Sequence, residues 1–191
     1  MKIIGITGGS GAGKSTLCAE LERCGATVVD ADAISRMVTK NGGAAFDEIV
    51  QSFGDEILDG YGEINRKALA KIVFNDSHKL ELLEKITHKY VFEEMQRQIS
   101  ECKSQVAVLD VPLLFNENFP FNCDVTVAVI ADKAVRIKRI MQRDGLDETA
   151  ALERLKNQIT DEEYRVKADI CFVNDGNIDK IKEFANNLCK I

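Results

Sequence analysis

The chain alternates between short apolar runs rich in β-branched residues and longer stretches in which apolar residues recur every three or four positions. The short runs lack polar alternation, which is typical of strands buried on both faces of a sheet. Three such runs are clear and two are shorter: residues 3–6, 106–109 and 125–130, then 27–29 and 170–173. Helical spacing covers residues 14–24, 78–99 and 147–159. Strands that alternate with helices predict an α/β fold with a parallel sheet.

The stretch from residue 33 to residue 104 contains no convincing buried strand, and we interpret it as a mostly helical insertion. The alternative is that these helices simply cover the sheet. The distribution of glycines indicates an unusual backbone conformation near the start of the chain, since five of the thirteen glycines lie between Gly5 and Gly13. We expect a single domain of residues 1–191, with its core at about 1–32 and 105–191.

A phosphate-binding motif follows the first apolar run. The pattern G-x-x-x-x-G-K-[ST] is met by the segment Gly8, Gly9, Ser10, Gly11, Ala12, Gly13, Lys14 and Ser15. Glycines let backbone N–H groups turn inward around phosphate oxygens, and the helix that follows presents its positive end to the same anion. We expect Lys14 to reach the β- and γ-phosphates of ATP, Ser15 to ligate Mg²⁺, and Thr16 to face the α-phosphate.

A nucleotide site alone fits a kinase, an ATPase or a GTPase switch. GTPases usually carry N-K-x-D for guanine, and this sequence has none. A D-x-x-G match exists from Asp59 to Gly62, but it lies in a polar, turn-rich stretch, so we interpret it as a loop.

Acidic residues follow two of the predicted strands, where ligands gather in open α/β sheets. Asp30 and Asp32 follow residues 27–29, and we assign proton acceptance from an attacking hydroxyl to Asp32 and a structural role to Asp30. The alternative is that either residue caps the next helix. Asp110 ends the run 106–109 in a Walker-B-like position suited to Mg²⁺; the alternative there is a strand-end cap.

Arginines gather near the C-terminal third of the chain. They are Arg136, Arg139, Arg143, Arg154 and Arg165. Guanidinium groups suit charge that is spread over phosphoryl oxygens. We interpret residues 136–158 as a lid that closes over ATP, against the alternative of a solvated helical hairpin.

Composition limits the classes of partner and the cellular compartment that we expect for this protein. The 25 basic and 31 acidic residues give a net charge of -6, and tryptophan is absent, which argues against a nucleic-acid partner. No run approaches the roughly 20 apolar residues of a membrane span, and residues 3–6 are too short for a signal peptide. Six cysteines without a C-x-x-C pair favour reduced thiols and a cytoplasmic protein.

Taken in order, the motifs resemble those of dephospho-CoA kinases nearly end to end. The segments that carry this resemblance are Gly5-Ile6-Thr7-Gly8-Gly9, Val29-Asp30-Ala31-Asp32 with Arg36, Asn65-Arg66, His88, Asp110-Val111-Pro112-Leu113-Leu114-Phe115, and Arg139 to Asp144 with Arg154 and Gln158. The phosphate loop is shared by many families, whereas the Asp-Ala-Asp, the Pro-Leu-Leu-Phe and the arginine lid in this order are more selective. Two positions depart from the family. The family often has His-Pro where this chain has His88-Lys89, and it usually has Glu where this chain has Asn116, with Glu117 beside it.

The resemblance implies a P-loop NTPase fold with a five-stranded parallel core, a helical acceptor-binding region at about 33–104 and the lid. It implies transfer of the ATP γ-phosphoryl group to the ribose 3′-hydroxyl of dephospho-CoA, with Mg²⁺, by a monomer or weak homo-oligomer. The residues it implicates are catalytic Asp32, Lys14, Arg139 and Arg143, ATP-binding Arg139 and Arg154, and acceptor-binding Asp32, Arg36, Arg66, His88, Pro112, Leu113 and Leu114. The rival functions are another small-molecule P-loop kinase and a nucleotide-dependent switch.

Overall fold

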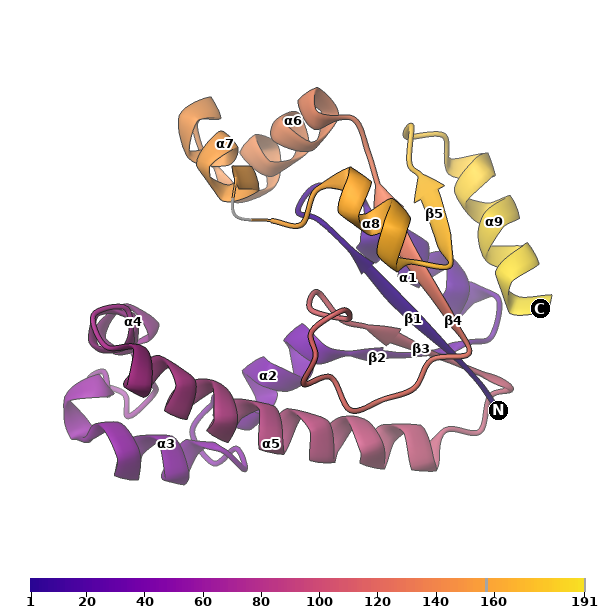
Figure 1. Cartoon of the computed structure of the whole chain (residues 1–191). Helices are drawn as coiled ribbons and strands as arrows, with labels where there is room; N and C mark the ends of the chain where they lie inside the picture. The colour runs from indigo at the N-terminus through magenta and orange to yellow at the C-terminus, as the bar shows by residue number, and fades with distance from the viewer. Residues whose placement is uncertain (157, 191) are drawn as a thin grey trace. The chain divides into compact units, whose positions relative to one another are not determined.

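The computed structural model describes residues 1–156 and 158–190, which form two compact units (Figure 1). The first unit comprises Met1–Val29 and Cys102–Ile191, and the second comprises Asp30–Glu101. The phosphate loop and the arginine-rich segment therefore belong to the first unit, and Asp32 belongs to the second.

A five-stranded sheet forms the centre of the first unit, as the sequence predicts. In spatial order its strands are β2 (Thr27–Asp30), β3 (Val106–Asp110), β1 (Lys2–Gly8), β4 (Val125–Ile130) and β5 (Ile170–Val173). The pairs β1–β3, β1–β4 and β4–β5 are parallel. Ile6 of β1 pairs with Asp110, so that the end of β3 lies beside the strand that leads into the phosphate loop.

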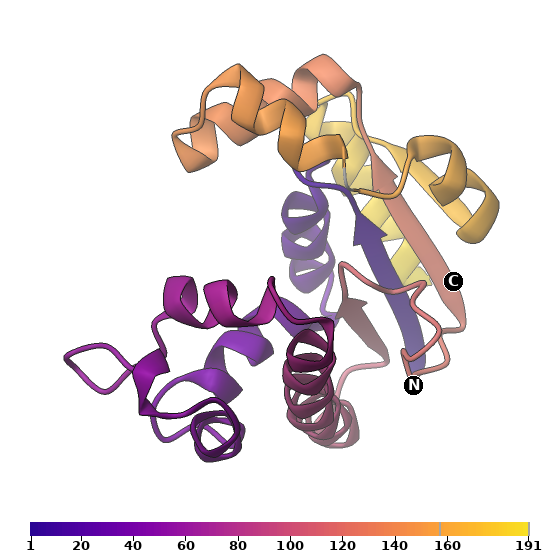
Figure 2. The same cartoon turned by 60° about the vertical axis from the view of Figure 1, so that its left-hand side comes forward.

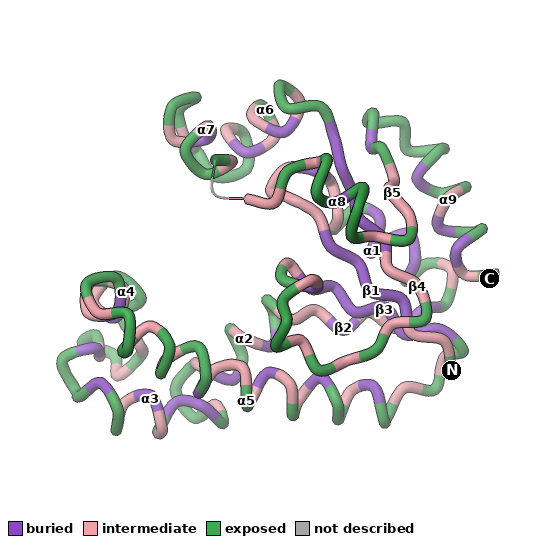
Figure 3. Tube along the Cα trace, viewed as in Figure 1, coloured by how far each residue is buried: buried purple, intermediate pink, exposed green. Residues whose placement is uncertain are grey.

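Apolar side chains on both faces explain why these strands read as continuous apolar runs. Val127 and Val129 pack on one face with α1 (Lys14–Arg23) and α9 (Ile178–Lys190). Ala128 and Ile130, which alternate with them, pack on the other face with Tyr164 of α8 (Asp161–Lys167). Figure 3 shows the central strands as buried and much of the outer helical surface as exposed. Burial of both faces removes the alternation that a half-exposed strand would show.

The arginine-rich segment consists of α6 (Lys133–Asp144) and α7 (Glu148–Lys156), followed by α8. The sequence predicted one helix over 147–159, whereas α7 ends at Lys156 and α8 begins at Asp161; Asn157 lies outside the described residues. Thr160 explains the new start, because it caps α8 in a reciprocal capping box with Glu163.

The second unit is helical, as the sequence predicts for this stretch (Figure 2). Its elements are α2 (Ala31–Thr39), α3 (Phe46–Phe53), the 3-10 turn η1 (Asp55–Ile57), α4 (Arg66–Val73) and α5 (Ser77–Glu101). Asp59 to Gly62 form a tight loop between the bridged residues Leu58 and Ile64, which confirms that this D-x-x-G match is not a switch motif after a buried strand. Among the described residues, the helices are all too short or too polar to cross a membrane.

Candidate active site

The phosphate loop leads from β1 into α1 through backbone that requires glycine. Gly13 has φ +97, and a Cβ there would collide with the side-chain nitrogen of Asn174. Gly8 also has no room for a side chain, because a Cβ there would collide with the carbonyl oxygen of Val129. Ser15 on the first turn of α1 is exposed. The loop is therefore held by close neighbours and leaves the start of α1 open to a ligand.

Side chains from two distant segments hold the loop carbonyls. Arg139 Nη1 donates to Gly11 O at 3.1 Å and to Ala12 O at 3.3 Å. Asn174, which is 3% exposed at the end of β5, donates Nδ2–H to Ala12 O at 2.7 Å. Because these carbonyls are engaged by side chains, the neighbouring N–H groups remain for an anion. Within the described residues, no backbone carbonyl accepts from the N–H groups of Gly11, Gly13, Lys14 and Ser15.

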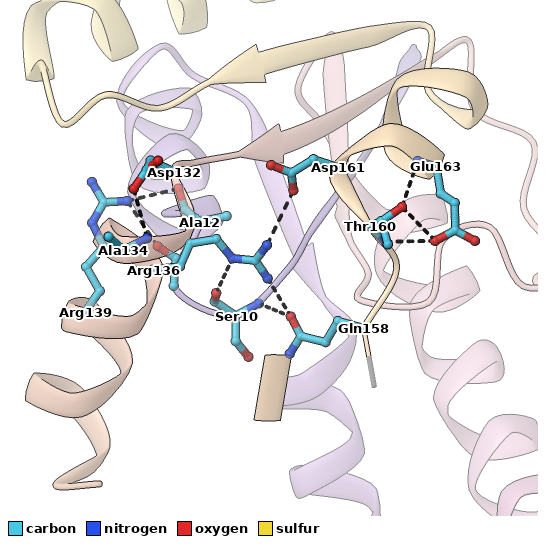
Figure 4. Close-up of polar contacts among 11 residues, drawn as sticks. Ser10, Ala12, Asp132, Ala134, Arg136, Arg139, Gln158, Thr160, Asp161 and Glu163 are labelled. Atoms are coloured by element: carbon cyan, nitrogen blue, oxygen red, sulfur yellow. Dashed lines mark hydrogen bonds and ion pairs between the residues drawn. The ribbon is translucent and has the colours of Figure 1, made fainter. Parts of the chain in front are cut away.

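The preceding residue of the loop, Ser10, is held at both of its backbone groups (Figure 4). Arg136 Nε donates to Ser10 O at 3.0 Å, and Ser10 N donates to Gln158 Oε1 at 2.9 Å. Arg136 also donates to Gln158 Oε1 at 2.8 Å and lies 3.4 Å from Asp161 Oδ1. The start of α6 and the segment before α8 thus both contact the loop.

Lys14 and Asp110, which we expect to hold different parts of a metal–nucleotide complex, form an ion pair with each other. Asp110 is 6% exposed at the end of β3, and its second oxygen lies 3.5 Å from the Cys18 thiol. A carboxylate so far from water requires a charged or hydrogen-bonding partner, and Lys14 supplies one. Lys14 and Asp110 thus neutralise each other beneath the loop.

Asp30 and Asp32 differ in their roles at the start of α2. Asp30 is the N-cap, and its side chain accepts from Ala33 N at 2.9 Å. Asp32 lies in the first turn and is exposed, and its carboxylate has no hydrogen bond or ion pair with any residue that the structure describes. The capping alternative therefore applies to Asp30, and the Asp32 carboxylate remains available for other chemistry.

The outer lid arginines converge on one carboxylate. Arg143 forms two hydrogen bonds of 2.8 Å with Asp144, and Arg154 also contacts Asp144. Hydrogen bonding to Arg143, with a smaller contribution from Arg154, lowers the pKa of Asp144, and the same pairing raises the pKa of Arg143. Both arginines are exposed, so these pairs exchange readily with solvent or with an anionic ligand.

In the second unit, two arginines of the expected acceptor site meet. A cleft of about 270 Å³ is lined by Arg36 of α2 and Arg66 of α4, together with Lys40. Its remaining lining residues are Ser35, Thr39, Ile49, Glu63, Ile64, Leu69, Leu83 and Thr87. Positive charge beside apolar walls suits a phosphorylated organic molecule. His88, which follows Thr87 on α5, stacks on Phe92 with ring centroids 5.3 Å apart.

The two departures from the family pattern have local structural partners. Lys89 Nζ lies 3.0 Å from Glu48 Oε2, to which the Tyr90 hydroxyl also donates at 2.7 Å. Hydrogen bonding from Tyr90, then from Lys89, lowers the pKa of Glu48. Lys89 therefore links α5 to α3. Asn116 accepts from Asn118 N at 2.9 Å and closes a turn.

The Pro-Leu-Leu segment divides into buried and exposed parts. Pro112 O accepts from the Thr7 hydroxyl at 3.0 Å, beside the start of the loop. Leu114 is 6% exposed and packs so closely over Gly5 that a Cβ there would lie 2.9 Å from it. Leu113 is 56% exposed. Of the two leucines, only Leu113 offers its side chain to a ligand in this structure.

Asn174 was missed from sequence, and Arg136 was predicted only as part of the lid. A signal for Asn174 exists, because it directly follows the short apolar run 170–173 and thus stands at the carboxyl end of a strand. No comparable signal distinguishes Arg136 from the other lid arginines.

Comparison with known proteins agrees with this arrangement. The family model for dephospho-CoA kinase matches residues 2–180. A dephospho-CoA kinase of Corynebacterium diphtheriae is 37% identical over 191 residues, which cover 98% of this chain and 96% of the relative. Among solved structures, a Thermus thermophilus protein superposes with a TM-score of 0.86 at 31% identity, over 100% of this chain and 97% of the other. A dephospho-CoA kinase from Campylobacter jejuni superposes with a TM-score of 0.60 at 28% identity, over 99% of this chain and 96% of the other.

Proposed function

The chain belongs to the dephospho-CoA kinase family, and on this premise we propose that it transfers the γ-phosphoryl group of ATP to the ribose 3′-hydroxyl of dephospho-CoA, which gives CoA and ADP. This reaction is the last step of coenzyme A synthesis. The observation that carries the proposal is the phosphate loop, whose Gly11 and Ala12 carbonyls are engaged by side chains while the N–H groups of Gly11, Gly13, Lys14 and Ser15 remain for an anion. The nucleotide triphosphate is held there, with Lys14 drawn from Asp110 towards the β- and γ-phosphates.

The residues near the loop also fit a magnesium ion. Ser15 and Asp110 offer a hydroxyl and a carboxylate oxygen, and Mg²⁺ uses one or two protein oxygens together with substrate phosphates. Among the described residues, no group of three or more acidic, histidine or cysteine side chains forms a metal cage, which agrees with such a sparse donor set. Held by Ser15 and Asp110, the ion would supply positive charge that neutralises the phosphate oxygens.

Asp32 receives the proton of the attacking hydroxyl. Its carboxylate is exposed and has no other hydrogen-bond or ion-pair role among the described residues, whereas Asp30 serves as the helix cap. A carboxylate is a far weaker base than an alkoxide, so Asp32 orients the hydroxyl and accepts the proton late. This timing suits phosphoryl transfer, in which catalysis is mostly positioning and charge neutralisation.

Arg139, Arg143 and Arg154 neutralise the phosphoryl oxygens as the lid closes. Arg139 already lies against the loop, at 3.1 Å from Gly11 O. Arg143 and Arg154 share Asp144, and an incoming phosphate replaces that carboxylate with a more highly charged partner.

The cleft of the second unit holds the acceptor. Arg36 and Arg66, with Lys40, bind the phosphate groups of dephospho-CoA, and the apolar walls contact its organic portions. His88 and the exposed Leu113 contribute further contacts. The enzyme works as a monomer or weak homo-oligomer in the cytoplasm, where the six cysteine thiols stay reduced.

The decisive experiment incubates the protein with Mg·ATP and dephospho-CoA and follows both nucleotides and acceptor by mass spectrometry. We expect stoichiometric ADP and a product with one added phosphoryl group, which phosphorus NMR places on the ribose 3′-oxygen. Parallel reactions with adenosine, AMP and phosphopantetheine test for another small-molecule kinase. Slow ATP hydrolysis that dephospho-CoA does not stimulate would instead favour a nucleotide-dependent switch.

A further inference from the structure

Arg136 is a buried cation at the root of the lid. It is 7% exposed, although it lies only one turn into a helix whose other arginines face solvent or the loop surface. Burying a guanidinium is unfavourable unless its N–H groups find acceptors and its charge finds a partner. Figure 4 shows the side chain pointing between Ser10, Gln158 and Asp161.

Arg136, Gln158 and Ser10 of the phosphate loop form a closed ring of hydrogen bonds. Arg136 Nε donates to Ser10 O at 3.0 Å, Ser10 N donates to Gln158 Oε1 at 2.9 Å, and Arg136 Nη2 donates to the same Gln158 oxygen at 2.8 Å. Both backbone hydrogen-bonding groups of Ser10 are thereby used. The orientation of the next peptide units, which supply the phosphate-binding N–H groups, depends on this fixed point.

The charge partner of Arg136 is itself held in place. Asp161 Oδ1 lies 3.4 Å from Arg136 Nη1 and belongs to the first turn of α8. Thr160 and Glu163 fix that turn by their capping box. The ring is therefore attached to a firm helix end rather than to a loose loop.

The arginines of α6 differ in burial along one face. Arg136, Arg139 and Arg143 are separated by three and four positions, which places them on the same side of the helix. Arg136 is buried, Arg139 is half-buried against Gly11 O, and Arg143 is exposed and paired with Asp144. Because each of the three side-chain nitrogens of Arg136 has an acceptor within the protein, it is the arginine of this face that has no need of a nucleotide partner.

We propose that Arg136 is a positioning residue for the phosphate loop, which acts with Gln158 as a clamp on Ser10 and holds both ends of the lid to the loop. The clamp does not touch ATP. It fixes the Ser10 carbonyl and N–H, from which the phosphate-binding part of the loop continues, so ATP affinity depends on it. This inference rests on the nucleotide-binding half of the proposed function and is independent of the acceptor.

The test compares Arg136→Met, Gln158→Leu and the double variant with Lys138→Met, a matched control that removes an exposed cation from the same helix. ATP affinity is measured directly by titration without acceptor, and hydrogen exchange of residues 9–13 is measured in the nucleotide-free protein. We expect Arg136→Met to weaken ATP binding about tenfold or more and to speed exchange in the loop, since small displacements of a positioned group have large effects. The double variant should be no worse than about twofold beyond the worse single variant, because members of one network are not additive.

A purely structural Arg136 would lower the thermal midpoint and leave ATP affinity and loop exchange like those of Lys138→Met, and that result would overturn the proposal. If Arg136→Met does not fold, Gln158→Leu removes only a neutral amide from the ring and decides the matter by the same two measurements. Arg136→Lys keeps the charge but not the planar fork, so it should fall between wild type and Arg136→Met in ATP affinity. Failure to phosphorylate dephospho-CoA by a wild-type protein that binds ATP would contradict the proposed acceptor and leave this inference standing.

Discussion

At the scale of single residues, the site is held by side chains that neutralise each other. Lys14 pairs with Asp110, whose side chain is 8% exposed, and the Cys18 thiol lies on the other carboxylate oxygen. In the proposed reaction both charged groups take new partners, Lys14 the phosphates and Asp110 the metal. The ion pair therefore compensates two charges that the proposed reaction uses.

The first prediction concerns Lys14. We expect Lys14→Ala to lower kcat by about 10²–10³ or more, because it removes the cation that neutralises the transferring phosphoryl group. It also removes the cation that pairs with the buried Asp110 carboxylate, so the thermal midpoint should fall. The Lys14→Ala, Asp110→Asn double variant should recover the midpoint but not the turnover. Steady-state kinetics with thermal unfolding measures both effects, and near-native turnover in Lys14→Ala would reject its role.

The second prediction uses Asp30 and Asp32 as a matched pair on the same helix turn. Asp32→Asn should lower kcat by roughly 10²–10⁴, because an amide cannot accept the proton. Asp30→Asn should change kcat little, because Asn caps a helix about as well as Asp. ATP affinity should be unchanged in Asp32→Asn, since the loop holds the phosphates. A loss of less than about threefold in Asp32→Asn would remove it from the catalytic step.

The sequence predicts those parts of the site whose residues lie next to a recognisable pattern along the chain. The loop from Gly8 to Ser15 and the Asp30–Asp32 pair follow apolar runs directly, so they could be found from spacing alone. Arg136 and Asn174 could not be assigned to the loop, because their contacts depend on which strand ends lie side by side. The sheet order β2-β3-β1-β4-β5 places β4 beside β1 and β5 beside β4, and no local pattern encodes that order.

At the scale of elements, the strands could be predicted from a local pattern, whereas one helix end was not. The five strands were predicted because burial on both faces leaves an unbroken apolar run. The helix predicted over residues 147–159 exists as α7, but its end was placed too far along the chain, although Thr160 and Glu163 form a capping box that the sequence displays as T-x-x-E. Apolar spacing alone continued the helix to Ile159, whereas the cap starts a new one.

The third prediction concerns the helices of the lid. Hydrogen exchange across residues 136–158 should slow when an ATP analogue is added, if Arg143 and Arg154 leave Asp144 for phosphate oxygens. The slowing should be greatest over 143–156, because Arg136 and Gln158 are already bonded to Ser10 without nucleotide. Exchange that stays the same at saturating analogue would identify α6 and α7 as a solvated hairpin.

At the scale of the whole molecule, the proposed functions divide between the two compact units. The groups that we propose to hold ATP lie in Met1–Val29 and Cys102–Ile191, whereas the cleft with Arg36 and Arg66 is lined entirely by residues of Asp30–Glu101. The chain passes between the units at two points only, and Asp32 lies just beyond the first of them. Substitutions in one unit should therefore affect one substrate more than the other.

The fourth prediction tests that division in the cleft. Arg36→Met and Arg66→Met should each raise the KM for dephospho-CoA by about 10- to 100-fold, since a hydrogen bond to a charged group contributes about 1.5–3 kcal/mol. ATP affinity, measured by titration without acceptor, should stay within about twofold of wild type, because the phosphate loop belongs to the other unit. Lys67→Met is the matched control: it removes an exposed cation next to Arg66 that does not line the cleft, and it should leave both constants unchanged. If Arg36→Met and Arg66→Met behave like this control, the cleft is not where the acceptor binds; if they weaken ATP binding instead, the units do not divide the substrates.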